Sequence, residues 1–160
     1  MSFLRSAPGE EPLVLEAMFR ATPERVFRAW TKPEEISAWF GLRRNDVTKA
    51  EIDLRVGGTW RFHLRSENAD AAFFEGEYFA IEPAQKLVFS WTHVVQSEDG
   101  ERTQSVASQV TVTFEPVGKA TRVHLLHESL SGEGARVNVS RGWGASLANL
   151  DALLSGEASG

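Results

Sequence analysis

The sequence predicts an α+β fold in which a curved antiparallel sheet wraps around one long C-terminal helix. Two observations carry this prediction. Between residues 47 and 130, apolar and polar side chains alternate with period two, which is typical of half-buried strands. After that region, Val139, Trp143, Leu147, Leu150 and Leu154 recur at helical spacing and share one stripe. A sheet that curls around a helix tends to leave a hollow between them, and we expect function to lie in that hollow.

The N-terminal part predicts one strand followed by two short helices. Leu13 to Arg20 alternates as a strand would. Thr22-Pro23-Glu24 begins the first helix, because Thr is a good N-cap, Pro is tolerated at the first helical position and Glu favours the positive end of the helix. Pro33 restarts the chain as a second helix, whose buried side carries Ile36, Trp39 and Phe40.

Six further strands are expected, separated by short turns that make neighbouring strands antiparallel. The turns are marked by Gly57-Gly58, Pro83, the segment from Ser97 to Gly100, and Pro116 to Gly118. The strands are expected around 50–55, 60–65, 73–81, 87–91, 106–114 and 123–127. Gly132 to Gly134 then leads into the terminal helix.

Composition excludes several classes of function. The 160 residues fit a single domain, expected over 12–155, with loose tails at 1–11 and 156–160. A net charge of −5 and scattered basic residues argue against nucleic acid as a partner. The absence of Cys excludes disulfides and sulfur-based zinc sites. No apolar stretch is long enough for a membrane span or signal peptide, so a cytoplasmic protein without membrane contact is expected.

The order and spacing of several short stretches resemble a known family. These stretches are Ala21 to Thr31, Pro33 to Trp39, Asp53 to Gly58, Gly76 to Pro83, Leu87 to Trp91, and Gly142-Trp143 with Leu147 and Leu150. Together they resemble the helix-grip fold of the START/SRPBCC superfamily. Within it, the chain is similar to the family of the C-terminal domain of the activator of the ninety-kilodalton heat-shock-protein ATPase.

The resemblance implies a fold and a cavity and leaves three functions open. The first is binding of a small, mostly hydrophobic molecule between the sheet and the terminal helix, which needs no cofactor. The second is a protein-binding module that stimulates a chaperone ATPase. The third is a cyclase or dehydratase acting on an aromatic or polyketide substrate, with His127 as base. Either a monomer or a homodimer is compatible with the sequence.

Strand parity selects the candidate lining of the cavity. If Phe89 and Trp91 face the terminal helix, His93 does too, and Val123 and Leu125 place His127 on the same concave face. An imidazole there is suited to hydrogen bonding or proton transfer, or it is a half-buried histidine bonded to a neighbouring carbonyl. The lone Tyr offers a hydroxyl. The expected ligand-binding residues are Trp39, Phe62, Tyr78, Phe89, Trp91, His127 and Trp143.

Other candidate groups have simpler explanations. Asp53 and Arg55 are read as an exposed ion pair, and Glu75 and Glu77 as residues of the solvated outer face. The spacing of the four His residues matches no recognised metal site, so no metal is expected. The glycines of Gly142-Trp143-Gly144 are expected to let the helix backbone approach the sheet closely.

Overall fold

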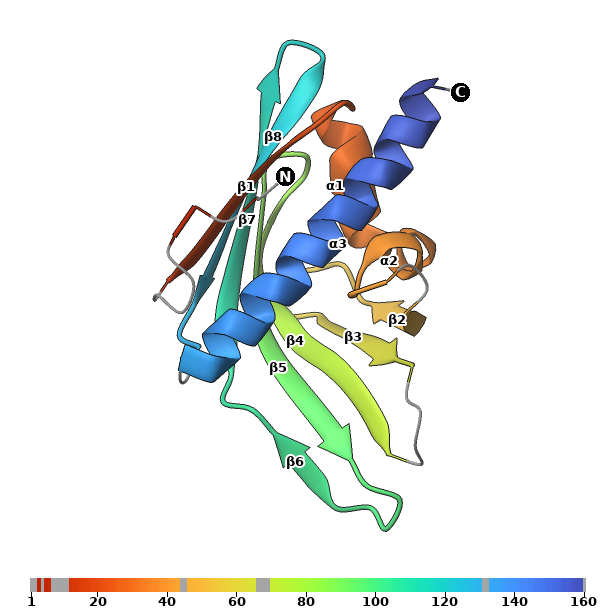
Figure 1. The fold of residues 1–160 in the computed structure, drawn as a ribbon, viewed down its shortest axis with the longest axis vertical. Coiled ribbons are helices and arrows are strands. Elements are labelled where there is room, and N and C mark those ends of the chain that lie inside the picture. Colours follow the sequence, from red (N-terminus) through yellow and green to blue (C-terminus); the bar gives the residue numbers. More distant parts are fainter. Residues whose placement is uncertain are drawn as a thin grey trace.

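The computed structural model of the chain describes residues 3, 5–6, 12–43, 46–65, 70–130 and 133–159 (Figure 1). The elements follow the expected order of a strand, two helices, a run of strands and a long helix. In chain order they are β1 (Leu13–Phe19), α1 (Pro23–Thr31), α2 (Pro33–Trp39), β2 (Val47–Ile52), β3 (Thr59–Leu64), β4 (Ala71–Glu82), β5 (Lys86–Gln96), β6 (Arg102–Gln104), β7 (Ser108–Val117), β8 (Ala120–Glu128) and α3 (Glu133–Ser159).

The strands form one antiparallel sheet of eight strands in the order β1-β8-β7-β5-β4-β3-β2, with β6 paired to β5. From β2 to β6, each strand pairs with the next in the chain, and β7 pairs with β8 in the same way. β7 also pairs with β5, and β8 pairs with β1, so β1 and β2 form the two edges of the sheet. β6 is a short polar strand without an apolar alternation, and it was not expected from the sequence. Val106 was expected in a strand but lies between β6 and β7, with 69% of its surface exposed.

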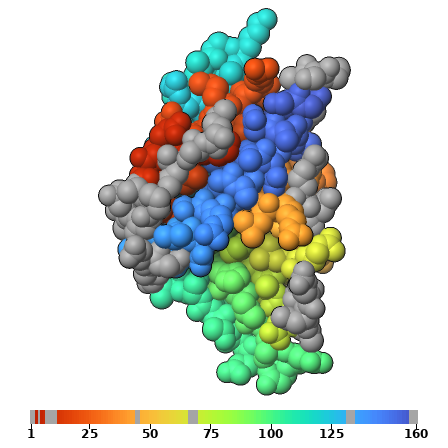
Figure 2. All heavy atoms as spheres, viewed as in Figure 1, coloured from red at the N-terminus to blue at the C-terminus, as the bar shows by residue number. Residues whose placement is uncertain are grey.

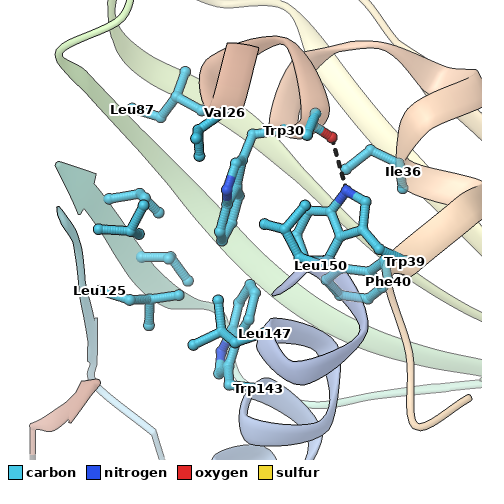
Figure 3. Close-up of a cluster of buried hydrophobic side chains, with 14 of the residues drawn as sticks. Val26, Trp30, Ile36, Trp39, Phe40, Leu87, Leu125, Trp143, Leu147 and Leu150 are labelled. Carbon is cyan, nitrogen blue, oxygen red and sulfur yellow. Dashed lines mark hydrogen bonds between the residues drawn. The ribbon is translucent and has the colours of Figure 1, made fainter. Parts of the chain in front are cut away.

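Both short helices begin where the sequence indicates. Thr22 caps α1, since its hydroxyl accepts a hydrogen bond from the backbone N–H of Arg25 at 3.2 Å. Both helices carry proline at their N-terminus. The indole of Trp39 in α2 donates to the carbonyl of Ala29 in α1 at 2.9 Å, which ties the two helices together (Figure 3).

The turn between β2 and β3 requires glycine at two successive positions. Gly57 has a φ of 85°, in the left-handed region that side chains disfavour. A Cβ atom on Gly58 would lie 2.2 Å from the carbonyl oxygen of Asp53. The turn is also bonded to β4, because Gly57 N–H donates to the carbonyl of Tyr78 at 2.9 Å. Asp53 and Arg55 form the exposed ion pair that was expected, with an N–O distance of 2.7 Å.

The long helix α3 lies diagonally across the face of the sheet that also carries α1 and α2 (Figure 1). Trp143, Leu147, Leu150 and Leu154 are all buried, as their helical spacing predicts. In Figure 2, α3 lies between β1 and α2, and the strands at the foot of the molecule extend beyond it. Among the described residues, no helix is long and apolar enough to cross a membrane.

Part of the expected N-terminal tail is bonded to the domain. Phe3 is buried, and its carbonyl accepts a hydrogen bond from the backbone N–H of Glu16 in β1 at 2.8 Å. Arg5 N–H donates to the carbonyl of Val14 at 2.7 Å, so the described N-terminal residues cover part of the free edge of β1. At the other end, α3 continues to Ser159, past the expected boundary at 155.

Candidate functional site

The space between α3 and the sheet contains two hollows of very different size. The smaller one, here called the inner void, has a volume of about 20 Å³. It is surrounded by side chains from α1, α2, α3 and the middle of the sheet, namely Trp30, Ile36, Phe40, Trp60, Phe62, Tyr78, Leu87, Phe89, Trp91 and Trp143. A volume of this size holds about one water molecule, so this part of the interior is essentially filled.

The larger hollow, here called the outer pocket, has a volume of about 620 Å³. It lies between the N-terminal half of α3, the segment that follows α2, the ends of β3 and β4, and β5. Its lining residues are Phe40, Gly41, Leu42, Arg43, Asp46, Leu64, Arg65, Phe74, Trp91, His93, Ser105, Val106, Leu130, Ala135, Asn138, Val139, Gly142, Trp143 and Ser146. Small-molecule sites in proteins usually have volumes of about 300–1,000 Å³, so the outer pocket has the size of a ligand site.

Four aromatic rings form what we call the aromatic floor of the outer pocket: Phe40, Phe74, Trp91 and Trp143. The ring centroids of Phe74 and Trp91 are 4.4 Å apart, and those of Trp91 and Trp143 are 5.2 Å apart. Phe40 meets Trp143 nearly at right angles, with centroids 5.6 Å apart. These contacts hold the rings in place, so the floor offers a preformed apolar surface.

The loop that carries Gly41 is hydrogen-bonded to α3 through Ser146 and Asn149. The Ser146 hydroxyl accepts a hydrogen bond from Gly41 N–H at 3.0 Å and donates to the carbonyl of Gly142 at 2.8 Å. The side-chain amide of Asn149 donates to the carbonyls of Trp39 and Gly41, both at 3.1 Å. The segment after α2, which forms one wall of the outer pocket, is therefore bonded to α3.

His127 lies on the concave face as predicted, but it is completely enclosed by protein. Its Nδ1 accepts a hydrogen bond from the Trp143 indole N–H at 3.0 Å. Its Nε2 lies 2.8 Å from the hydroxyl oxygen of Ser108, which is in turn 3.2 Å from the carbonyl of Trp91. Because Nδ1 is an acceptor, the proton is on Nε2, which donates to Ser108, and the hydroxyl donates to the carbonyl. Both ring nitrogens of His127 are thus used to hold Trp143 and Trp91 in position.

The electrostatics of His127 follow from this enclosure. Burial lowers the pKa of His127 to about 3, since a charged imidazolium would be poorly solvated there. The ring is neutral at neutral pH and is a weak base. The geometry therefore supports a structural role for His127, by positioning the two tryptophans of the aromatic floor.

His93 is the histidine that reaches the outer pocket. It follows Trp91 on the same side of β5, and its ring lies 5.0 Å from that of Phe74. Part of the ring is exposed to solvent, and desolvation of the remainder lowers the pKa of His93. His93 is therefore neutral at neutral pH and offers a hydrogen bond at the edge of the pocket.

The seven sequence-predicted site residues fall into three groups in the structure. Trp91 and Trp143 line both the inner void and the outer pocket. Phe62, Tyr78 and Phe89 surround the inner void. Trp39 and His127 are enclosed by protein. The indole of Trp39 is hydrogen-bonded to Ala29, and the imidazole of His127 to Trp143. Burial also raises the pKa of Tyr78, so its phenol stays protonated.

The glycines of α3 do not have the role that the sequence suggested. A Cβ atom on Gly142 or Gly144 would meet no heavy atom within 4 Å outside the local helix backbone, so neither glycine is needed for close approach to the sheet. Gly142 instead lines the outer pocket, where the missing side chain leaves space. A glycine inside a helix costs stability, so the presence of Gly142 within α3 indicates from the sequence that this position has a special role.

Most of the residues around the mouth of the outer pocket were not identified from the sequence. Leu42, Arg43 and Val106 belong to connections between elements, where strand or helix periodicity gives no orientation. Leu42 and Val106 are 61% and 69% exposed, which is unusual for large apolar side chains. A ligand in the outer pocket would cover part of this apolar surface.

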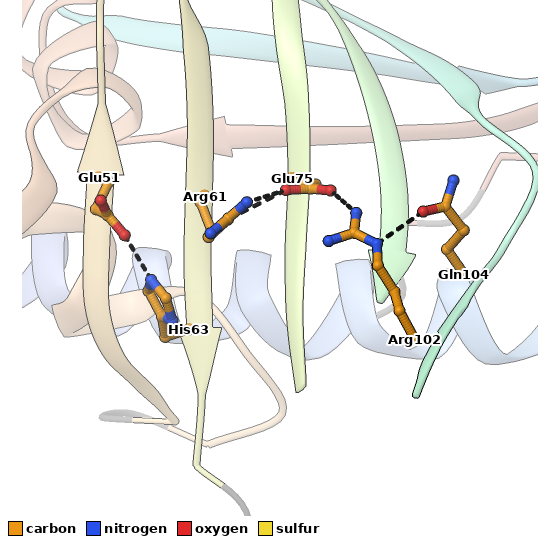
Figure 4. A network of polar contacts seen from close by, with 6 residues as sticks. All are labelled: Glu51, Arg61, His63, Glu75, Arg102 and Gln104. Atoms are coloured by element: carbon orange, nitrogen blue, oxygen red, sulfur yellow. Dashed lines mark hydrogen bonds and ion pairs between the residues drawn. The ribbon is translucent and has the colours of Figure 1, made fainter. Parts of the chain in front are cut away.

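The opposite face of the sheet carries a polar network, as the parity of Glu75 predicts (Figure 4). Glu75 accepts hydrogen bonds from Arg61 in β3, the shorter at 2.7 Å, and from Arg102 in β6. Partial burial would raise the pKa of Glu75, but the two arginines outweigh it and hold the pKa below its usual range. The carboxylate is therefore a structural link between strands. No group of His, Cys, Asp and Glu among the described residues is arranged to hold a metal ion.

Comparison with known proteins agrees with this architecture. The model of the family described as "Activator of Hsp90 ATPase homolog 1-like protein" matches residues 20–155. No curated protein matches the chain in sequence. An uncharacterized protein from Rhizobium leguminosarum has 27% identity and a TM-score of 0.73, with 90% of this chain and 93% of that chain covered.

Two more distant structures share the fold alone. A protein from Arthrobacter aurescens has 20% identity and a TM-score of 0.75, with 95% of this chain and 90% of that chain covered. DynU16, a protein in the dynemicin biosynthetic locus, has 20% identity and a TM-score of 0.69, with 91% of this chain and 48% of that chain covered. The family match spans most of the chain and the architecture is that of its structural neighbours. The protein therefore belongs to the family of Activator of Hsp90 ATPase homolog 1-like proteins.

Proposed function

We propose that this protein binds a small, mostly apolar molecule in the outer pocket, with the aromatic floor as the main contact surface. The observation that carries the proposal is the volume of about 620 Å³ beside four packed aromatic rings. Aromatic side chains contribute a large contact area and geometric preference for other rings. A ligand with a planar ring system would fit this surface best.

The surroundings of the floor support the same proposal. Trp143 is held by His127, and the loop after α2 is held by Ser146 and Asn149. A pocket whose walls are fixed before binding avoids the entropy cost of ordering them around the ligand. Phe62, Tyr78 and Phe89 surround the inner void behind the floor, and the ring of Phe62 lies 5.1 Å from that of Phe40.

Native mass spectrometry of the freshly purified protein tests whether a molecule co-purifies with it. We expect a mass shift that solvent extraction removes. A direct titration with N-phenyl-1-naphthylamine, a neutral aromatic fluorophore, tests the site itself. Saturable one-to-one binding is expected, and the absence of saturable binding by this probe together with the absence of any co-purified molecule would contradict the proposal.

A matched pair of variants on α3 assigns the binding to the outer pocket. Ala135 is exposed and lines the pocket, so Ala135→Trp should fill part of it and weaken probe binding more than tenfold. Ala152 is exposed on the same helix away from the pocket lining, so Ala152→Trp should bind as the unchanged protein does. Equal effects of the two variants would place the probe elsewhere.

A second candidate function, stimulation of a chaperone ATPase, is favoured by one surface feature besides the family description. Leu54, Val56 and Phe79 are exposed apolar side chains around the turn between β2 and β3. Exposed apolar side chains that gather together often mark protein-binding surfaces. An Hsp90 ATPase assay with added protein tests this candidate, which predicts stimulation that Val56→Asp removes and Ala135→Trp leaves unchanged.

The cyclase or dehydratase alternative gains no support from the proposed base. His127 is neutral, weakly basic and bonded through both ring nitrogens to protein groups. A general base must reach the proton that it removes from the substrate. The proposed function is therefore binding, with His127 as a positioning residue.

A further inference from the structure

The strand β6 is held by few backbone contacts and leads directly into a wall of the outer pocket. Among the described residues, β6 pairs only with β5, through three residue pairs at Val94 to Gln96. All three residues of β6 are exposed. The next two residues, Ser105 and Val106, line the outer pocket. The position of this wall therefore depends on what holds β6 in place.

The end of β6 connects the two faces of the sheet. Arg102 and Gln104 alternate along the strand, and their side chains meet Glu75 on the outer face (Figure 4). The following residue, Ser105, is bonded to the pocket residue His93. Its hydroxyl accepts a hydrogen bond from the backbone N–H of His93, and its own N–H donates to the carbonyl of His93, both at 2.9 Å. A contact made by Arg102 on the outer face therefore bears on the pocket wall.

The carboxylate of Glu75 in β4 reaches β6 across β5. It accepts hydrogen bonds from Arg61 in β3 and from Arg102 in β6 (Figure 4). Nε of Arg102 also donates to the side-chain oxygen of Gln104 at 3.0 Å. Both guanidinium groups lie over the ring of the buried Phe73, with their carbon atoms 4.6 Å and 5.6 Å from its centroid. Glu75 therefore joins β6 to the middle of the sheet.

The link between Glu75 and Arg102 is stronger than an ordinary surface ion pair. The side chain of Glu75 is 21% exposed and that of Arg102 is 39% exposed, so solvent screens the pair only in part. The hydrogen bond is also charge-assisted. For a strand of three exposed residues, one such contact is a large share of what holds it to the sheet.

We infer that Glu75 is a positioning residue for the outer pocket. Through Arg102 it holds β6, and through β6 it holds the wall formed by Ser105 and Val106. Glu75 itself is on the opposite face of the sheet and is not among the residues that line the pocket. This inference rests on the proposed function and adds a residue that acts on the site without touching a ligand.

Amide hydrogen exchange of the free protein tests whether Glu75 holds β6. The variant Glu75→Gln keeps the size of the side chain and removes its charge. The backbone N–H of Ser105 should then exchange about threefold to fivefold faster, the effect of losing a partly exposed ion pair. The N–H of Phe114, bonded to the carbonyl of Gln85 at 2.9 Å away from β6, should keep its rate. An unchanged rate at Ser105, or equal acceleration at both amides, would overturn the inference.

Titration with N-phenyl-1-naphthylamine tests whether this link acts on the pocket. Glu75→Gln should bind the probe about threefold more weakly, because the wall is in place in a smaller fraction of molecules. Arg102→Gln should have the same effect. The double variant should be no weaker than either single variant, since both residues act through one link. Unchanged affinity in Glu75→Gln, or losses that add in the double variant, would overturn the inference.

Glu51→Gln is the matched control on the same face. Glu51 in β2 pairs with His63 in β3, and its replacement changes the net charge by the same amount. The control should keep both the affinity for the probe and the exchange rate at Ser105. An equal loss of affinity in the control would show a nonspecific charge effect and overturn the assignment to Glu75. Failure of the probe to bind the unchanged protein would count against the proposed function, whereas the exchange rate at Ser105 tests the link without a ligand.

Discussion

The inner void and the outer pocket lie between the same helix and the same sheet, yet one is filled and the other is open. Around the inner void, α1 and α2 add Trp30 and Ile36 to the residues of the sheet, and about 20 Å³ remains. At the other end of the interface, α3 supplies small residues such as Ala135 and Gly142, and the volume is about 620 Å³. The side chains that the flanking elements contribute, more than the curvature of the sheet, thus decide where a cavity forms.

The largest expected effect concerns packing at the two ends. Leu150 is completely buried in the filled part, so Leu150→Ala should lower the free energy of unfolding by about 2–5 kcal/mol. Leu64 is partly buried and borders the open part, so Leu64→Ala should cost only about 1 kcal/mol. Denaturant unfolding measures both values. Similar losses would show that the open end is packed as tightly as the filled one.

A second prediction concerns the buried His127, which links the two parts. Its pKa is about 3 in the folded protein, below the ordinary 6.5. Between these values the unfolded chain binds a proton that the folded protein does not, so stability falls as the pH falls from 6.5 towards 3. The free energy of unfolding at pH 4.5 should therefore be about 2–3 kcal/mol lower than at neutral pH because of His127 alone.

The variant His127→Gln separates this contribution from that of the carboxylates. Glu75 and the other carboxyl groups are retained in the variant, so their share of the acid sensitivity stays. The unchanged protein should lose more stability than the variant between pH 7.5 and pH 4.5 when both are unfolded by denaturant. Parallel pH profiles of the two proteins would show that folding does not lower the pKa of His127.

The smallest expected effect separates helix stability from pocket volume. Gly142→Ala and Gly144→Ala should each raise the free energy of unfolding by about 0.5–1 kcal/mol, because alanine is the better helix former. Only Gly142 lines the outer pocket, so only Gly142→Ala should also change the affinity for N-phenyl-1-naphthylamine. An equal change in affinity for both variants would mean that helix stability, and not pocket volume, controls binding.

The fold could be predicted from the sequence because its signals are local. Period-two alternation identified the long strands, and the stripe from Val139 to Leu154 identified α3. The short strand β6 escaped, since Arg102, Thr103 and Gln104 have no apolar alternation and depend on pairing with β5. Val106 was wrongly expected in a strand because it is apolar, although it lies in an exposed connection between β6 and β7.

The candidate site could be predicted only in part. Parity correctly placed Trp91 and His127 on the concave face, and helical spacing placed Trp143 opposite them. Periodicity shows which way a side chain points, but whether rings fill or enclose a space depends on how far apart the elements lie. Arg43 and Leu42 are in an irregular segment, so their place at the mouth follows from the hydrogen bonds of Asp46 and Ser146, which leave no pattern in the sequence.

The most direct test of the account uses the five tryptophans as reporters, since each indole N–H gives its own signal in a two-dimensional NMR spectrum. Trp91 and Trp143 line the outer pocket, whereas Trp30, Trp39 and Trp60 lie in the filled part. Titration with N-phenyl-1-naphthylamine should shift the signals of Trp91 and Trp143 and leave the other three nearly unchanged. Shifts confined to Trp30, Trp39 and Trp60, or no shifts at saturating probe, would contradict the claim that the open end of this interface is the binding site.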